Sequence, residues 1–135
     1  MKLLTKNSDY AVRALVYLAK HNDRYVPSSE IASSETIPLH FLRRILQKLT
    51  KAGLVSSREG IAGGVRLAQH PSKIKVGEVI RIFQGRIQLS ECMFRKRLCS
   101  NRARCVLRKK IKQIEKSVIR QFERLTIASL LNEEE

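Results

Sequence analysis

Two short apolar segments flank a glycine-rich turn near the middle of the chain, directly after three helical patterns. Leu54–Arg58 and Val65–Ala68 have the character of strands, and the glycines between Gly60 and Gly64 permit a tight turn. The preceding helices are predicted over about 7–20, 29–33 and 38–52, and a further short helix over 76–83. Three helices followed by a two-stranded hairpin is the order of a winged helix-turn-helix domain. We therefore predict a mainly α fold with a two-stranded wing.

The ends of these helices carry recognisable capping residues. Asn7, Ser8 or Asp9 can cap the first helix, because short polar side chains accept hydrogen bonds from the first free N–H groups. Pro38 is a good first residue for the third helix, since its missing N–H would have no partner there, and Gly53 ends that helix. The buried face of the third helix is expected to consist of Phe41, Leu42, Ile45, Leu46 and Leu49.

The last helical pattern extends from about Arg104 to Leu130 and carries a heptad seam. Its seam positions are Leu107, Ile111, Ile114, Val118, Gln121 and Leu125. Spacing of this kind is typical of paired helices, and a small winged domain has little uncovered apolar surface to receive the whole helix. We therefore expect a homodimer, with a helix folded back on its own domain as the alternative. The expected organisation is a DNA-binding domain over 1–85, a cysteine-rich cluster-binding loop over 86–105, and a dimerisation helix with an acidic tail over 106–135.

The charge of the chain indicates its class of partner. Among 135 residues, 27 are Lys or Arg and 12 are Asp or Glu, which gives a formal net charge of +15. Such an excess fits a polyanion, most simply nucleic acid. No apolar run is long enough to cross a membrane, and the N-terminal apolar segment is broken by Arg13 and lacks a cleavage site. We expect a cytoplasmic protein without membrane contact, and no catalytic motif predicts an enzyme.

The helix 38–52 is the predicted recognition helix. Its first turns would enter the major groove, where base pairs can be told apart, and an arginine there can pair with two acceptors of one guanine. Its residues expected to face DNA are Pro38, Leu39, His40, Arg43, Arg44 and Lys48, with Gln47 further along. An ordinary exposed role is the alternative for His40. A dimer would present two such helices, so we expect a roughly palindromic operator on double-stranded DNA.

Two further segments are expected to contact the DNA backbone. Ser28 and Ser29 start the preceding helix, where amides and hydroxyls make a phosphate site. Arg58 and Arg66 flank the tip of the wing. The structural role expected for Gly63 and Gly64 is the tight turn, which glycines permit. The functional interpretation of the same residues is a close approach of the wing backbone to DNA.

Three cysteines lie directly before the last helix. Cys92, Cys99 and Cys105 are spaced C-x6-C-x5-C, unlike the C-x-x-C of zinc ribbons and thioredoxin-type pairs. Three soft ligands on one loop, with a fourth from elsewhere, suit an iron–sulfur cluster. Eight Lys and Arg residues against one acid between Glu91 and Lys110 favour the metal-binding thiolate. Direct oxidant sensing by the thiols and structural zinc are the alternatives.

Four segments in order resemble one family, the IscR/NsrR-like bacterial transcription regulators of the Rrf family. They are LTKNSDYAVRALVYLA, ETIPLHFLRRILQKLTKAGLVSSREGIAGGVRLA, IKVGEVIRIFQG, and the cysteine loop with the last helix. The resemblance covers essentially the whole chain. It implies a homodimeric winged-helix regulator, expected to be a repressor, whose operator binding changes with an iron–sulfur cluster that senses redox, nitric oxide or iron status. It also implies that the three cysteines are ligands, although the first gap holds six residues where five is common.

The fourth ligand differs between branches of the family. IscR-like members use a histidine three residues after the last cysteine, where this chain has Arg108, which stays protonated and cannot bind metal. NsrR-like members use a carboxylate of the first helix from the opposite subunit, and the matching residue is Asp9. Glu91 and a solvent or small-molecule ligand are the rivals. The resemblance to the NsrR-like branch favours a 4Fe–4S cluster, with 2Fe–2S as the alternative. A ligand from the second subunit would tie cluster state to dimer geometry.

Overall fold

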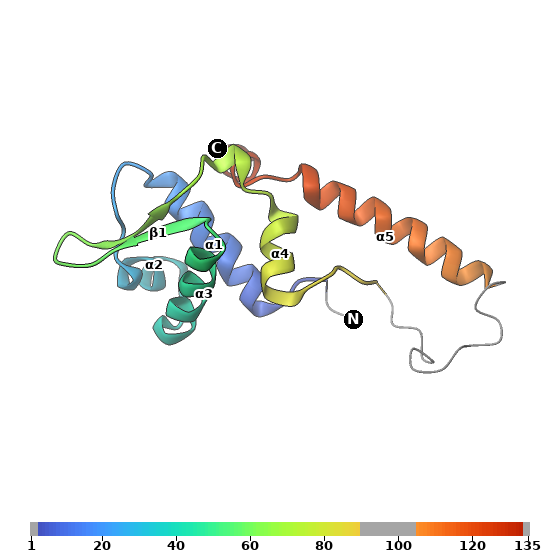
Figure 1. Cartoon of the computed structure of the whole chain (residues 1–135), viewed down its shortest axis with the longest axis horizontal. Coiled ribbons are helices and arrows are strands. Elements are labelled where there is room, and N and C mark those ends of the chain that lie inside the picture. Colours follow the sequence, from blue (N-terminus) through green and yellow to red (C-terminus); the bar gives the residue numbers. More distant parts are fainter. Residues whose placement is uncertain (1–2, 90–104, 134–135) are drawn as a thin grey trace.

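Helices dominate the part of the chain that the computed structural model describes, residues 3–89 and 105–133 (Figure 1). In chain order the elements are α1 (Lys6–Lys20), α2 (Ser28–Glu35), α3 (Leu39–Lys51), β1 (Val55–Arg58), β2 (Gly64–Leu67), the 3-10 helix η1 (Pro71–Lys73), α4 (Val76–Gln84), α5 (Val106–Arg124) and α6 (Ile127–Glu133). The predicted order of three helices, hairpin and short helix is confirmed, and so is the mainly α winged fold.

The helix α1 lies at the centre of the winged body. It packs against α2, α3, α4, β2 and α6. Ala11 and Ala14 are fully buried and small, so neighbouring helices can approach α1 closely. The largest fully buried apolar side chains around it are Leu15, Leu18, Ile31, Leu42, Leu49, Leu54, Ile74, Ile80 and Ile127. Because Ile127 belongs to α6, the C-terminal helix completes the core that the N-terminal helix begins.

The start of α1 differs from the prediction. The cap is Thr5, whose Oγ1 accepts from the Ser8 N–H at 3.3 Å, and not Asn7, Ser8 or Asp9. Ser8 is fully buried and donates to Oε1 of Gln84, at the end of α4, at 2.7 Å. The same oxygen accepts from the Thr5 N–H at 3.0 Å, and Gln84 Nε2 donates to the Leu3 carbonyl. This distant partner favours a helix that begins earlier than the local sequence indicates.

The two ends of α3 show one confirmed feature and two corrections. Gly53 adopts a φ of 79°, and the Leu54 N–H bonds the Leu49 carbonyl at 3.0 Å, which is the predicted glycine stop. Pro38 is the residue before the helix and not its first residue. Phe41 is 40 % exposed and lies against the His40 ring, so its assignment to the core was wrong. The buried face is narrower than predicted, because it consists of Leu42, Ile45, Leu46 and Leu49 alone.

The wing is an antiparallel pair with an added contact to the segment before α2. Val55 pairs with Leu67, and Arg58 with Gly64. Val65 also exchanges two backbone hydrogen bonds of 2.8 Å with Val26, so the residues before α2 pair with β2. The wing is thereby attached to the start of α2 as well as to the end of α3.

The predicted single helix from Arg104 to Leu130 is interrupted after Arg124. Leu125 is extended, and its carbonyl accepts from the Val76 N–H at 2.8 Å. The Ile127 N–H donates to the Ile74 carbonyl at 3.0 Å. Thr126 and Ser129 cap each other's backbone N–H groups, which starts the new helix α6. The prediction of one continuous helix was therefore wrong over its last turns.

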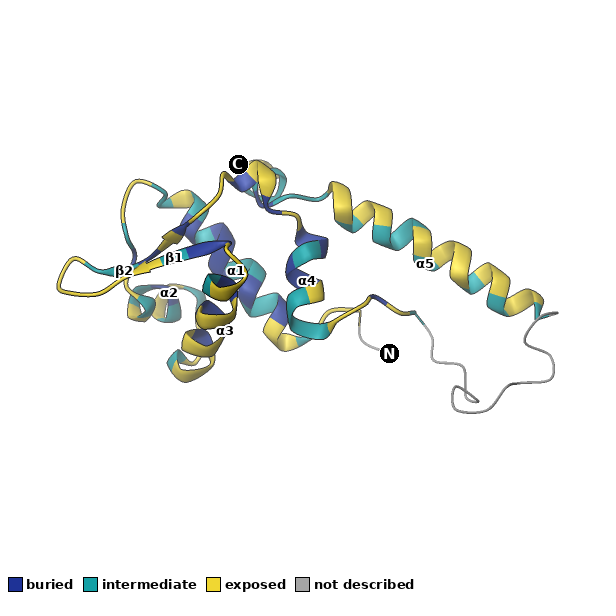
Figure 2. Ribbon diagram, viewed as in Figure 1, coloured by how far each residue is buried: buried dark blue, intermediate teal, exposed yellow. Residues whose placement is uncertain are grey.

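Among the described residues, the apolar contacts of α5 with the core come from its C-terminal half. Ile119 and Phe122 are partly buried against the core, whereas Leu107 is 69 % and Ile114 56 % exposed. No residue of α5 is buried, and Figure 2 shows the helix projecting from the winged body with a mixed exposed and intermediate surface. One end of the helix packs on its own domain, as the alternative expects, and the rest of the seam is open, so the homodimer stays a prediction.

Candidate nucleic-acid interface

The turn between α2 and α3 places the two helices of the helix-turn-helix. Thr36 ends α2 in the left-handed region, with a φ of 54°, which is uncommon for a β-branched residue. The following Ile37 is buried, and its N–H bonds the Ala32 carbonyl at 3.0 Å. Pro38 then sets the extended backbone from which α3 starts. The turn thus fixes the direction in which α3 leaves α2.

The outward face of α3 carries most of the predicted DNA-facing residues. Pro38, His40, Arg43, Arg44 and Lys48 are exposed, and Leu39 is partly so. They do not all point the same way. The Lys48 ammonium lies 5.5 Å from the Phe83 ring centre of α4, whereas Arg43 lines a groove toward the wing. Lys48 and Arg43 therefore lie toward different neighbours of α3, and only Arg43 lines the groove.

This groove lies between the start of α2, the face of α3 and the wing, and has a volume of about 540 Å³. Its lining brings together four predicted residues, Ser28, Arg43, Gln47 and Gly64. The others are Leu46, Thr50, Lys51, Ser57 and Val65. The site prediction omitted Lys51 and Ser57, although Lys51 follows Arg43 and Gln47 at helical spacing of four. Ser57 could be found only from the strand pairing.

The N-terminus of α2 opens on the same groove. Pro27 precedes the helix and provides no side-chain cap, so the first N–H groups have no side-chain acceptor. Ser28 is partly buried in the groove and Ser29 is exposed. Uncapped amides with two hydroxyls at a helix N-terminus are suited to a phosphate oxygen.

The wing residues have distinct structural settings. The Arg58 guanidinium lies 5.4 Å from the centre of the Tyr25 ring, and Arg66 is exposed on β2. A Cβ on Gly64, whose φ is 144°, would collide with the backbone of Val26 and Pro27, and a Cβ on Gly63 with the Arg58 carbonyl. The predicted turn is observed at Gly63, whose N–H bonds the Gly60 carbonyl at 3.0 Å, whereas Gly64 is required by a close approach to Val26 that the sequence did not predict.

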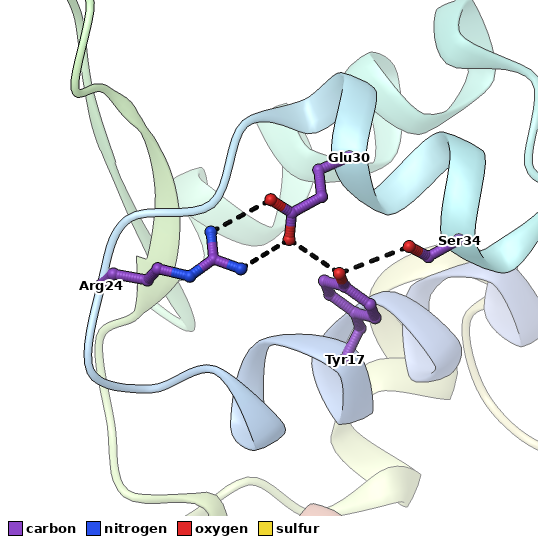
Figure 3. Close-up of polar contacts among 4 residues, drawn as sticks. All are labelled: Tyr17, Arg24, Glu30 and Ser34. Carbon is purple, nitrogen blue, oxygen red and sulfur yellow. Dashed lines mark hydrogen bonds and ion pairs between the residues drawn. The ribbon is translucent and has the colours of Figure 1, made fainter.

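A polar network behind the groove joins α1 to α2 (Figure 3). Tyr17 Oη donates to Glu30 Oε2 at 2.7 Å, and Arg24 binds both Glu30 oxygens at 3.1 and 2.7 Å. Ser34 Oγ donates to Tyr17 Oη at 3.3 Å. The hydrogen bonds from Arg24 and then Tyr17 hold the pKa of Glu30 below its ordinary value, and the bond to Glu30 raises the pKa of Arg24.

Two of the four predicted metal ligands are among the described residues. Asp9 lies in the first turn of α1 with its side chain 48 % exposed, 3.4 Å from Arg13 Nε. Cys105 is the residue before α5, and its Sγ accepts from the Arg108 N–H at 3.5 Å. A sulfur ligand fits this position, because N–H groups at a helix start stabilise negative charge. Cys92, Cys99 and the rival Glu91 lie outside the described residues, and residues 3–89 and 105–133 contain no group of three metal-binding side chains.

The fold and the basic groove define a winged-helix DNA-binding protein. A helix-turn-helix supplies a basic exposed helix face, a two-stranded wing flanks it, and both open on one groove. Among the described helices, none combines the length and apolar character needed to cross a membrane.

The chain belongs to the Rrf2 family, described as an iron-dependent transcriptional regulator, over residues 4–133. It is 30 % identical over 135 residues to the HTH-type transcriptional regulator NsrR of Shouchella clausii, with 98 % of this chain and 91 % of that protein covered. The T. potens IscR structure is 28 % identical with a TM-score of 0.79, covering 100 % of this chain and 89 % of the other. CymR, the global cysteine regulator of B. subtilis, shares the fold at 24 % identity and a TM-score of 0.83, covering 98 % of each chain. The family resemblance is thus confirmed, and the protein is a transcription regulator and not an enzyme.

Proposed function

We propose that this regulator binds a roughly palindromic DNA operator as a homodimer. The observation that carries the proposal is the groove where the uncapped start of α2, Arg43 of α3 and the wing meet. The amides and hydroxyls of Ser28 and Ser29 would bind a backbone phosphate and fix the register of the protein on DNA. Arg43 would then read a base edge in the major groove, and Arg58 and Arg66 would bind the backbone beside the wing.

The role of Arg43 can be tested on a duplex that the wild-type protein selects from a random pool. We expect Arg43→Ala to weaken binding to that duplex by about 1–3 kcal/mol, roughly fivefold to 150-fold, because one base contact is lost. Binding to unrelated duplex should fall much less. Lys112→Ala, on α5, is the matched control because it removes the same charge outside the groove. Equal losses for both variants would show that Arg43 contributes charge only.

We further propose that the operator affinity depends on an iron–sulfur cluster held by Cys92, Cys99 and Cys105 with Asp9 of the partner subunit. When bound, such a cluster supplies a centre that oxidants, nitric oxide or iron loss can change. The position of Cys105 supports this proposal, because this residue precedes the first turn of α5 and its sulfur already accepts a backbone hydrogen bond. The exposure of Asp9 supports it too, since this carboxylate can be reached from outside its own chain. A change at these ligands would then alter the contacts at the start of α5 and at α1.

The second candidate is a regulator that senses oxidants directly through its thiols, with the same DNA-binding residues. Cys105 favours this candidate, because its side chain is a free, partly buried thiol. Structural zinc is a third use of the same residues. An anaerobic absorption spectrum with iron, sulfide and zinc analysis separates the three. Iron-free, colourless protein from iron-replete cells would exclude the cluster.

The fourth ligand can be tested once the iron-containing protein is prepared. We expect Asp9→Ala to leave a cluster with an altered spectrum that bleaches faster under nitric oxide or air, because one iron loses its protein ligand. Asp23→Ala, in the turn after α1, is the control carboxylate. A spectrum and bleaching rate equal to those of the wild type would assign the fourth position to Glu91 or solvent.

A further inference from the structure

A second hollow lies outside the nucleic-acid interface, between α4, the chain that follows it, and α5. Its volume is about 260 Å³. Its lining consists of Gly77, Arg81, Arg86, Ile87, Ile119 and Glu123. None of these residues belongs to the groove between α2, α3 and the wing. The hollow therefore needs an explanation of its own.

Contacts within the fold hold the three walls of this pocket in place. A Cβ on Gly77 would lie 3.4 Å from Phe122, so α4 and α5 cross closely at one edge. Ile87 is buried at 6 % exposure, and the Leu89 N–H donates to Glu115 Oε2 of α5 at 3.2 Å. The chain after α4 is thus attached to α5 along the second edge. The pocket is a product of packing and not a gap between loose segments.

The charged side chains of the lining are exposed to solvent. Arg81, Arg86 and Glu123 make no side-chain hydrogen bond or ion pair with any residue in the described part of the chain. Two cations and one anion therefore face one small space whose apolar lining is Ile87 and Ile119. A ligand that carries both charges, a carboxylate and an ammonium, complements this set, because guanidinium groups bind carboxylates in bidentate fashion and Glu123 can accept from an ammonium.

We propose that this pocket binds a small free amino acid with an apolar side chain. The carboxylate of the ligand binds Arg81 and Arg86, its ammonium group binds Glu123, and its side chain contacts Ile87 and Ile119. The size of the pocket agrees with a small amino acid, because its volume of about 260 Å³ corresponds to roughly eight or nine water molecules at liquid density.

The position of the pocket gives the binding a regulatory consequence. The ligand would contact α4 of the winged body and α5 at once, and α5 carries the open seam. A molecule that prefers one relative position of α4 and α5 shifts the population toward that position. The pocket lining contains none of the proposed cluster ligands, so amino-acid binding can be tested independently of the cluster proposal.

Three related probes test the proposal on the metal-free wild-type protein. L-valine carries both charges, isovalerate only the carboxylate, and isobutylamine only the ammonium. We expect ¹H–¹⁵N NMR titration with L-valine to shift the amides of Gly77, Ile87 and Ile119, with affinity at least about tenfold higher than for either single-charge probe. No shifts up to the solubility limit of L-valine, or equal binding of isovalerate, would overturn the proposal.

Matched variants locate the site. Arg81→Ala and Glu123→Ala should each weaken L-valine binding at least about tenfold, because each removes one charge complement. Arg120→Ala, on a part of α5 outside the pocket, should leave it unchanged. Retained binding in both pocket variants would refute the assignment. The probe comparison on wild-type protein decides the question even if a variant does not fold.

Discussion

At the scale of single residues, the interface depends on side chains that lie behind it. Glu30 accepts hydrogen bonds from Tyr17 of α1 and from Arg24 of the turn before α2, while Ser28 of the same α2 faces the groove. The network therefore joins α1 to the helix that carries the proposed phosphate site, without lining the groove. Sequence patterns predicted both residues, Ser28 because it starts a helix and Arg43 because helical spacing shows which residues face outward. They did not identify the network, because Tyr17 and Glu30 are neighbours only once α1 and α2 are packed.

The network makes a small, pH-dependent contribution to stability. The pKa of Glu30 is lowered in the folded state, so its contribution is fully present above the pKa of the unfolded chain and is lost as pH falls through the folded pKa. We expect Glu30→Gln to lower the free energy of unfolding slightly at neutral pH, and the difference from wild type to vanish in acid. The effect is small because both partners are partly exposed and screened by solvent.

Denaturant unfolding measured across the acidic range checks this expectation. Glu59→Gln, on the exposed wing, is the control because Glu59 has no hydrogen bond or ion pair with the described residues. A constant difference between wild type and Glu30→Gln at every pH would contradict the role given to this carboxylate.

At the scale of elements, the wing is positioned by backbone contacts. Gly64 lies so close to Val26 and Pro27 that no side chain fits, and Val65 is hydrogen-bonded to Val26 in both directions. The glycine-rich turn was predictable, because glycines between two strand patterns are a local signal. The contact with Val26 was not, since it joins residues on either side of two helices.

Gly64→Ala should therefore destabilise the wing more than a neighbouring glycine substitution. We expect a loss of about 3 kcal/mol, because the alanine adds a positive-φ strain and a backbone collision. Gly60→Ala is the matched control: its φ is 104° but the space around it is open, so about 1 kcal/mol is expected. Thermal or denaturant unfolding measures both. Equal losses would show that the contact with Val26 does not constrain the wing.

At the scale of the whole molecule, α5 extends from the body with an open apolar seam. Leu107 and Ile114 are more than half exposed, whereas Val118 and Leu125 of the same seam pack on the core. An exposed apolar seam on a long helix is the usual basis of helix pairing. This arrangement supports the proposed homodimer and would place two recognition helices on one operator.

Substitution in the seam tests the dimer. Ile114→Arg should weaken self-association at least about tenfold, because it places an unpaired charge in an apolar contact. Gln113→Arg, one residue away and also exposed, is the control for added charge. Sedimentation velocity over a range of concentrations gives the association state. A wild-type monomer, or an unaltered Ile114→Arg dimer, would exclude the seam as the interface.

The sequence alone determined the order of the helices, the glycine turn of the wing, the basic charge and the family resemblance. These features follow from periodicity, turn chemistry and composition, which are properties of neighbouring residues. Tertiary structure decided the cap at Thr5, the exposure of Phe41, the interruption after Arg124 and the pocket between α4 and α5. Each depends on the presence or absence of a contact between residues far apart in the sequence. Ser8 donates a hydrogen bond to Gln84, 76 residues away, and the Leu125 carbonyl accepts one from the Val76 N–H. Such contacts form only when the whole chain has packed, because local patterns carry no information about which distant groups will satisfy them.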